Sequence, residues 1–241
     1  MNEPLYRYLE VAIYAVLNML PCLVLALYPF RRDFRFSMKG TCILVGFVTC
    51  VQIVTGILAC FVFRKQAGFL SLLSTATYGL FYFFAVKVHW GKRLFTLLML
   101  SNVANFLVIS SKYLERVLFG AIAHEYYRWT HSLCMFIVNL IVMIPLFLYF
   151  RKRFPPTMSR HSVETAWRYL WLIPCTFYLV WYYQLYSQGG PSLEVGLKPM
   201  TTVFLGVINL GALLIYHLIL RLIDEQDKLR DLETKKHQLT L

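Results

Sequence analysis

The sequence predicts an all-α, polytopic membrane protein with about seven transmembrane helices. Hydrophobic residues make up 59% of the 241 residues, and charged residues only 15%, whereas soluble domains average about 25% charged residues. The apolar residues form long runs that do not alternate with polar ones, which favours helices over the strands of a membrane barrel. This composition excludes a disordered chain and argues against an ordinary soluble enzyme.

Seven apolar stretches approach the length of about 20 residues that a helix needs to cross a bilayer. They cover residues 5–28, 40–63, 69–86, 94–110, 130–150, 169–187 and 200–220. The third and fourth are short and partly polar, and the sequence leaves open whether both cross the bilayer. We therefore expect a seven-helix membrane domain over residues 1–220, followed by a cytoplasmic segment over residues 221–241.

Basic residues predict the orientation of these helices. Seventeen of the 24 Lys and Arg lie in segments 29–39, 87–93, 151–168 and 221–241, which fall on one side of a seven-span chain. Because Lys and Arg gather in cytoplasmic loops, we expect a multi-pass protein of the cell membrane with its N-terminus outside and its tail in the cytoplasm. The net charge of +12 is then explained by these loops and the lipid surface, and no nucleic-acid partner is expected.

The tail continues a spacing of three and four residues that begins inside the seventh stretch. It contains no Gly or Pro, and six of its eight core-type positions are apolar, as in a coiled coil; these positions are Ile215, Leu218, Leu222, Glu225, Leu229, Leu232, Lys236 and Leu239. We expect the helix to pair with a second copy as a homodimer, although a solvated amphipathic tail has the same pattern. No helix stop signal precedes Leu241, so we also expect that more helix follows in a longer protein.

A multi-span domain followed by this tail resembles the N-terminal membrane half of GHKL-type sensor histidine kinases, in particular the accessory gene regulator sensor kinases of Gram-positive bacteria. The resemblance is carried by the tail residues 222–233, which read LIDEQDKLRDLE. It implies a membrane domain that reads an extracellular signal, often a peptide. A coiled helix then leads to a phosphoacceptor helix and an ATP-binding domain that acts on a response regulator.

The chain departs from that family because it contains neither a phosphoacceptor box of the Arg-His-Asp type nor ATP-lid motifs. His237 lies in the run KKHQL and does not match the box, so we assign it no role in phosphotransfer. G-x-S-x-G, P-loop and H-E-x-x-H motifs are also absent from the sequence. We therefore expect no catalytic residue and no cofactor in this chain, and contact with a response regulator only through a kinase domain outside it.

The candidate ligand-sensing residues are polar and aromatic side chains predicted at the outer ends of the spans. They are His124, Glu125, Arg128, Trp129, His131, Tyr182, Tyr183 and Gln184. The spacing of His124, Arg128 and His131 allows them to share one helix face, and segment 111–129 has the pattern of an amphipathic helix on the membrane surface. Two histidines and one carboxylate are too few for a closed metal site, so we expect no metal. Since the outer loops are short, the ligand is expected to be small, peptide-like or membrane-borne.

Polar residues also occur within the apolar stretches, where we expect them to hydrogen-bond between helices. They are Glu10, Asn18, Gln52, Asn102, Asn105, Asn139, Asn209 and His217. Asn102 and Asn105 lie three residues apart, which favours a polar pocket or an interhelical contact. The six cysteines lie in apolar runs without a CxxC pair and are expected to act as small apolar residues.

The function predicted from these features is that of a membrane-embedded sensor module. The last span would transmit an extracellular signal into the cytoplasmic dimerisation helix. Two alternatives remain at this stage: a transporter or permease component, and a membrane scaffold whose tail recruits a partner. The absence of internal repeats and of intramembrane charge pairs in the predicted spans speaks against the transporter.

Overall fold

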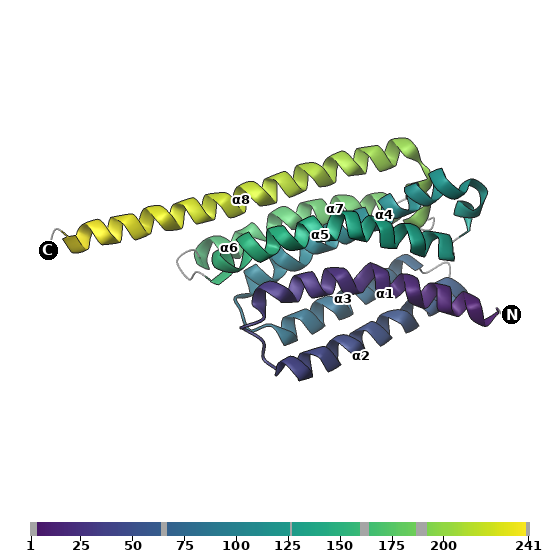
Figure 1. Cartoon of the computed structure of the whole chain (residues 1–241), viewed down its shortest axis with the longest axis horizontal. Helices are drawn as coiled ribbons and strands as arrows, with labels where there is room; N and C mark the ends of the chain where they lie inside the picture. Colours follow the sequence, from purple (N-terminus) through teal and green to yellow (C-terminus); the bar gives the residue numbers. More distant parts are fainter. Residues whose placement is uncertain (1–3, 64–66, 126, 160–163, 187–191, 240–241) are drawn as a thin grey trace.

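A computed structural model describes residues 4–63, 67–125, 127–159, 164–186 and 192–239 of the chain. The described residues are helical throughout apart from short connections, which confirms the predicted all-α class (Figure 1). In chain order the elements are α1 (Leu5–Leu27), η1 (Tyr28–Phe30), α2 (Met38–Ile57), the π-helical turn η2 (Leu58–Val62), α3 (Ala67–Ala85), α4 (Trp90–Phe119), η4 (Gly120–His124), α5 (Trp129–Ser159), α6 (Glu164–Leu170), α7 (Leu172–Tyr186), η5 (Ser192–Leu197) and α8 (Pro199–Leu239).

Five helices of the described chain are long and apolar enough to cross a membrane, which confirms a helical membrane protein. They are α1 together with η1, α2 together with η2, α4 together with η4, α5 and α8. The third and sixth predicted stretches are also helical, as α3 with 19 residues and as α6 followed by α7 with 7 and 15 residues. The helices lie side by side in one bundle (Figure 1).

The sixth stretch is interrupted because Pro174 has no backbone N–H. A helical residue at position 174 would donate its N–H to the carbonyl of Leu170, and Leu170 is where α6 ends. The helix resumes at Leu172, and the next available donor, the Cys175 N–H, bonds to the Trp171 carbonyl at 3.2 Å. The break leaves Trp167 of α6 fully buried against Phe95 of α4, with ring centroids 5.4 Å apart.

Helix α4 is the centre of the bundle, because it contacts α1, α3, α5, α6, α7 and α8. The Asn102 side chain is fully buried in it. Its amide donates to the Tyr216 hydroxyl of α8 at 2.8 Å and to the Pro174 carbonyl of α7 at 3.1 Å. One amide therefore joins three helices, as expected for a polar side chain inside a membrane bundle.

Other intramembrane polar residues make the interhelical bonds that the sequence predicts. The Gln52 amide of α2 donates to the Ser74 carbonyl of α3 at 3.0 Å. The Asn139 amide of α5 donates to the Leu17 carbonyl of α1, also at 3.0 Å. His217 of α8 pairs with the Tyr149 hydroxyl of α5 at 2.9 Å. All six cysteines are free thiols.

Segment 111–119 does not form the separate surface helix that its amphipathic pattern predicts. It continues α4 without a break to Phe119, where Gly120 adopts a left-handed conformation with φ 50° and ends the helix. Ser111, Lys112 and Glu115 are consequently buried between helices instead of facing lipid headgroups. The prediction was wrong because these polar residues find partners inside the bundle, within α4 and in the segment that follows it.

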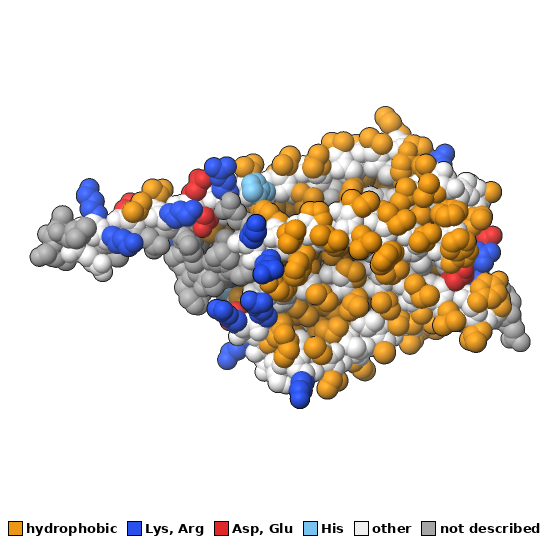
Figure 2. Space-filling model, viewed as in Figure 1, with side chains coloured by type: hydrophobic (Ala, Val, Ile, Leu, Met, Phe, Trp, Pro, Cys, Tyr) orange, Lys and Arg blue, Asp and Glu red, His pale blue; other side chains and the backbone are white. Residues whose placement is uncertain are grey.

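The two ends of the bundle differ in charge. Apolar side chains cover its middle, while Lys and Arg gather at the end from which the α8 tail projects (Figure 2). The N-terminus and the connection from α4 to α5 lie at the opposite end (Figure 1). In the tail, Ile223 still packs into the core, whereas Leu229 and Leu232 are 61% and 62% exposed. The packing of α8 on the bundle therefore continues to at least Ile223.

We expect Gly91→Ala to destabilise the bundle. A Cβ at this position in the first turn of α4 would lie 2.0 Å from the Trp167 carbonyl oxygen, and a backbone atom cannot yield as a side chain can. The expected loss is about 1–3 kcal/mol, seen as a lower midpoint of thermal unfolding in detergent. The matched variant Gly46→Ala in α2, where a Cβ meets nothing within 4 Å, should not lower the midpoint; equal midpoints for the two variants would contradict this packing.

Candidate functional site

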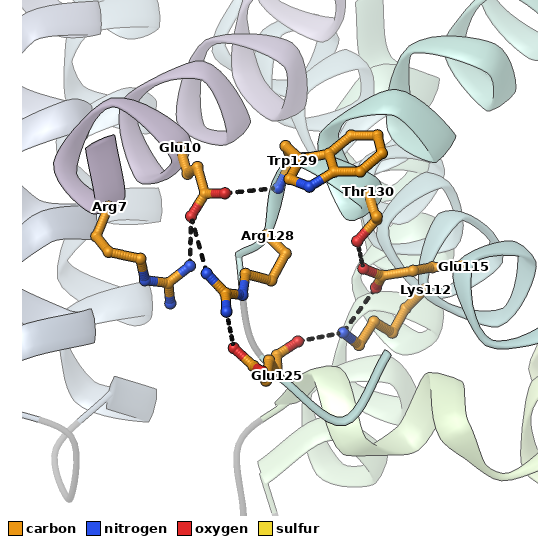
Figure 3. A network of polar contacts seen from close by, with 8 residues as sticks. All are labelled: Arg7, Glu10, Lys112, Glu115, Glu125, Arg128, Trp129 and Thr130. Carbon is orange, nitrogen blue, oxygen red and sulfur yellow. Dashed lines mark hydrogen bonds and ion pairs between the residues drawn. The ribbon is translucent and has the colours of Figure 1, made fainter. Parts of the chain in front are cut away.

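A network of charged side chains occupies the end of the bundle opposite the tail (Figure 3). Its centre is an ion pair within α4, in which Lys112 Nζ lies 2.8 Å from Glu115 Oε2. The three-residue spacing places both side chains on one face of the helix. Neither side chain has any exposed surface.

Partners from two other elements satisfy this pair. The Lys112 ammonium also donates to the backbone carbonyl of Glu125 at 2.9 Å, beyond the end of η4. The second Glu115 oxygen accepts a hydrogen bond from the Thr130 hydroxyl in the first turn of α5. Because a buried charge is tolerated only when it is paired and hydrogen-bonded, these contacts hold the α4–α5 connection in place.

A second carboxylate, Glu10 of α1, extends the network across the bundle. It forms an ion pair with Arg7 and accepts a hydrogen bond from the Trp129 backbone N–H at 3.1 Å. Trp129 is the first residue of α5, so the carboxylate satisfies an N–H that lacks a partner within the helix and lies at the positive end of the helix dipole. This contact fixes the start of α5 against α1.

Arg128 links the two halves of the network. Its guanidinium lies 2.5 Å from the Glu125 carboxylate and 3.9 Å from that of Glu10. The pKa of Arg128 is raised above its ordinary value, mainly by the hydrogen bond to Glu125, so this residue stays charged. Glu125 is 54% exposed, which leaves this edge of the network open to a ligand.

His131 lies beneath the network and is fully buried. Its Nε2 is 3.1 Å from the Ser111 hydroxyl, which donates its proton to the Val108 carbonyl at 2.8 Å. Since a hydroxyl has one proton, Nε2 of His131 is the donor in this pair. The ring also packs on Tyr14 of α1, with centroids 4.9 Å apart.

The short helix η5 covers the network from the side of α8. Arg116 of α4 donates to the Leu197 carbonyl. A Cβ on Gly196 would lie 2.7 Å from the Cβ of Lys112, so only glycine fits this close approach. The element that leads into α8 is thus packed directly on the buried lysine.

The structure brings together four of the predicted sensing residues, Glu125, Arg128, Trp129 and His131. His124 is exposed at the end of η4. It does not share a helix face with Arg128 and His131, because η4 ends at His124 and α5 begins at Trp129. Among the described residues, no group of three His, Cys, Asp or Glu side chains is arranged to hold a metal ion.

The predicted residues of α7 have different surroundings. Tyr182 lines a cavity inside the bundle, and Tyr183 is 69% exposed on the outside of α7. Gln184 is partly buried beside them. The sequence interpretation missed Lys112 and Glu115, although an oppositely charged pair three residues apart beside an apolar run was a usable signal.

Comparison with protein-family models, with curated proteins and with solved structures gives no match. The function is therefore inferred from the residues and geometry of this chain. Chemically, the network is a set of mutually neutralised charges that joins α1, α4, α5 and η5. Its exposed edge, formed by Glu125 and Trp129, is where an external molecule would meet it.

We expect Lys112→Met to destabilise the protein by about 3–5 kcal/mol, because it leaves the Glu115 carboxylate buried without its counter-ion. Lys112→Met combined with Glu115→Gln should regain most of this loss, since no net charge is then buried. Thermal unfolding in detergent measures both effects.

The matched control is Arg221→Met, which breaks a pair with Glu225 on the exposed tail. An exposed pair contributes only about 0–1 kcal/mol, so this change should be nearly neutral. A Lys112→Met midpoint as close to wild type as that of Arg221→Met would show that the buried pair does not hold this end together.

Proposed function

We propose that this chain is the membrane-embedded sensor module of a two-component histidine kinase. An extracellular small molecule or peptide acts on the network end, and α8 passes the change to a cytoplasmic, dimerising tail. A kinase domain following the tail then acts on a response regulator. The observation that carries the proposal is the continuity of α8, whose 41 residues form one helix about 60 Å long from the network end to the free tail.

The distribution of charge supports the orientation that this function requires. Lys and Arg gather at the tail end of the bundle (Figure 2), as expected for a cytoplasmic side. In this arrangement the N-terminus and the polar network face outwards. Helix α3 and the α6–α7 pair lie within the same bundle as the five long apolar helices. When these two also cross the membrane, the chain has seven spans, with its N-terminus outside and its tail in the cytoplasm.

Two contacts connect α4 and its surroundings to α8, one at the outer end of the bundle and one nearer its middle. One is the packing of Gly196 on Lys112, because η5 leads directly into α8. The other is the hydrogen bond from Asn102 to Tyr216, near the middle of α8. A ligand that binds two arrangements of these contacts with different affinity would shift the population of α8 positions.

The tail is suited to pairing with a second copy of itself. Two ion pairs, Arg221 with Glu225 at 3.0 Å and Lys228 with Asp224 at 2.7 Å, form along the helix. Glu225, a predicted core-type position, is therefore already paired within its own helix. The remaining apolar positions are strongly exposed: Leu222 by 59%, Leu229 by 61% and Leu232 by 62%. Lys236 is exposed as well, and the side chain of Leu239 lies outside the described residues, as does that of His237.

Disulfide cross-linking tests the pairing of the tail. Leu229→Cys or Leu232→Cys should form a covalent dimer in membranes under mild oxidation, because the two positions lie on the proposed seam. Gln238→Cys, on the opposite face of the same helix, is the matched control and should cross-link several-fold less. The chain with only its natural cysteines sets the background. Equal cross-linking at positions 229 and 238 would contradict a defined seam.

Helix continuity is tested with a chimera that joins this chain to the kinase half of a well-characterised sensor kinase. One residue inserted after Arg221 rotates the downstream helix by about 100° and should change the kinase output. Seven inserted residues leave a net rotation of about 20° and should largely preserve it. If both insertions give the same autophosphorylation rate as the parent, signal transfer through α8 is excluded.

A further inference from the structure

A cavity of about 160 Å³, partly open to the outside of the bundle, lies between α1, α2, α3, α4 and α7. On α4 it is lined by Asn105 and Val108. Lys112 follows Val108 by four residues, so the cavity begins about 6 Å below the charged network. It is thus a separate site, within the membrane-spanning part of the molecule.

The lining is polar but uncharged. No Asp, Glu, Lys, Arg or His occurs among the described residues around the cavity, whose polar groups are amides, hydroxyls and phenols, including Asn18, Gln52, Ser101, Asn105, Tyr178 and Tyr182. An ion in this low-dielectric site would have no counter-charge and would lose its hydration. The occupant that fits this lining is therefore neutral and forms hydrogen bonds. The tyrosine rings also offer aromatic surface on which a flat ring can pack.

Some lining residues already have partners, and others do not. The Gln52 amide donates to the Ser74 carbonyl and accepts from the Ser74 hydroxyl. In contrast, the side-chain oxygen of Asn18 and the hydroxyl of Tyr78 are buried without any hydrogen-bond partner. Rotation of the Asn18 amide about its last, soft torsion exchanges its oxygen and nitrogen. The amide can therefore turn its unpaired oxygen towards a donor inside the cavity.

The volume sets the size of the occupant. A cavity of about 150 Å³ in a protein core is sufficient to hold benzene, and this one is slightly larger. A single aromatic ring or a compact pair of fused rings matches this space.

We propose that the cavity binds a neutral aromatic molecule of one or two fused rings that carries an N–H or O–H donor. The donor bonds to the Asn18 amide oxygen, and the ring packs against the tyrosines of α3 and α7. This inference is independent of the sensor function, because binding is measured on the present chain alone.

Equilibrium dialysis of labelled indole against the chain in lipid nanodiscs tests the proposal, with empty nanodiscs subtracted to remove partition into lipid. We expect saturable binding of one indole per chain. Its analogue benzofuran has nearly the same shape, with a ring oxygen in place of the N–H donor, and should bind about tenfold more weakly, the effect of one lost hydrogen bond.

Variants assign the binding to the cavity. Ala104→Phe fills the space with a ring and should abolish binding, and Asn18→Leu should weaken it about tenfold. Asn139→Leu is the matched control, because this intramembrane amide bonds to the Leu17 carbonyl and does not line the cavity; it should bind indole like the wild type. Ser101→Leu, a smaller substitution in the cavity wall, repeats the filling test if Ala104→Phe does not give a monodisperse protein.

Three results would overturn the proposal. Indole uptake that does not saturate would mean that the cavity holds only water. Saturable binding that persists in both filled variants would place indole elsewhere. Equal binding of indole and benzofuran would show that no hydrogen bond to Asn18 contributes to binding.

Discussion

The buried ion pair between Lys112 and Glu115 is the constraint on which one whole end of the molecule depends. With no exposed surface on either side chain, water cannot satisfy the charges, so the protein itself must supply the remaining partners. They come from the Glu125 carbonyl and the Thr130 hydroxyl, which fixes how the chain turns from α4 into α5. The glycine at position 196 lets η5 approach the same lysine. The segment that leads into α8 is therefore packed on the first carbons of the same side chain whose ammonium group forms the ion pair.

Helix α4 connects three features that are far apart in the sequence. Its outer third carries the ion pair, its middle lines the uncharged cavity with Asn105, and Asn102, one turn further in, is bonded to α7 and α8. Because the three features share one continuous helix, a shift of α4 at one level can reach the others. Helix α4 therefore connects the polar network, the inner cavity and the last helix.

The sequence alone was sufficient to predict the helices, but it was not sufficient to predict the contacts between them. Long apolar runs predicted every major helix, because length and hydropathy determine which segments can lie in a membrane. The missed features depend on contacts across the fold. The spacing of Lys112 and Glu115 is local, but their burial is not, since the remaining partners, the Glu125 carbonyl and the Thr130 hydroxyl, come from beyond the end of α4. Likewise, Glu10 meets the N–H of Trp129 across 119 residues. The prediction that His124, Arg128 and His131 share one helix face was wrong, because the spacing of residues does not reveal that Gly120 ends a helix.

The bond between Asn102 and Tyr216 holds α8 at a point well inside its length. From Tyr216 to Leu239 the helix continues for 23 residues, a lever arm of about 35 Å. Pivoting about that hydrogen bond by about 5° would displace the far end by about 3 Å, as calculated from the helical rise. Such a pivot would convert a small adjustment beside one asparagine into a displacement comparable to the width of a side chain, at the part of the molecule that stands clear of the bundle.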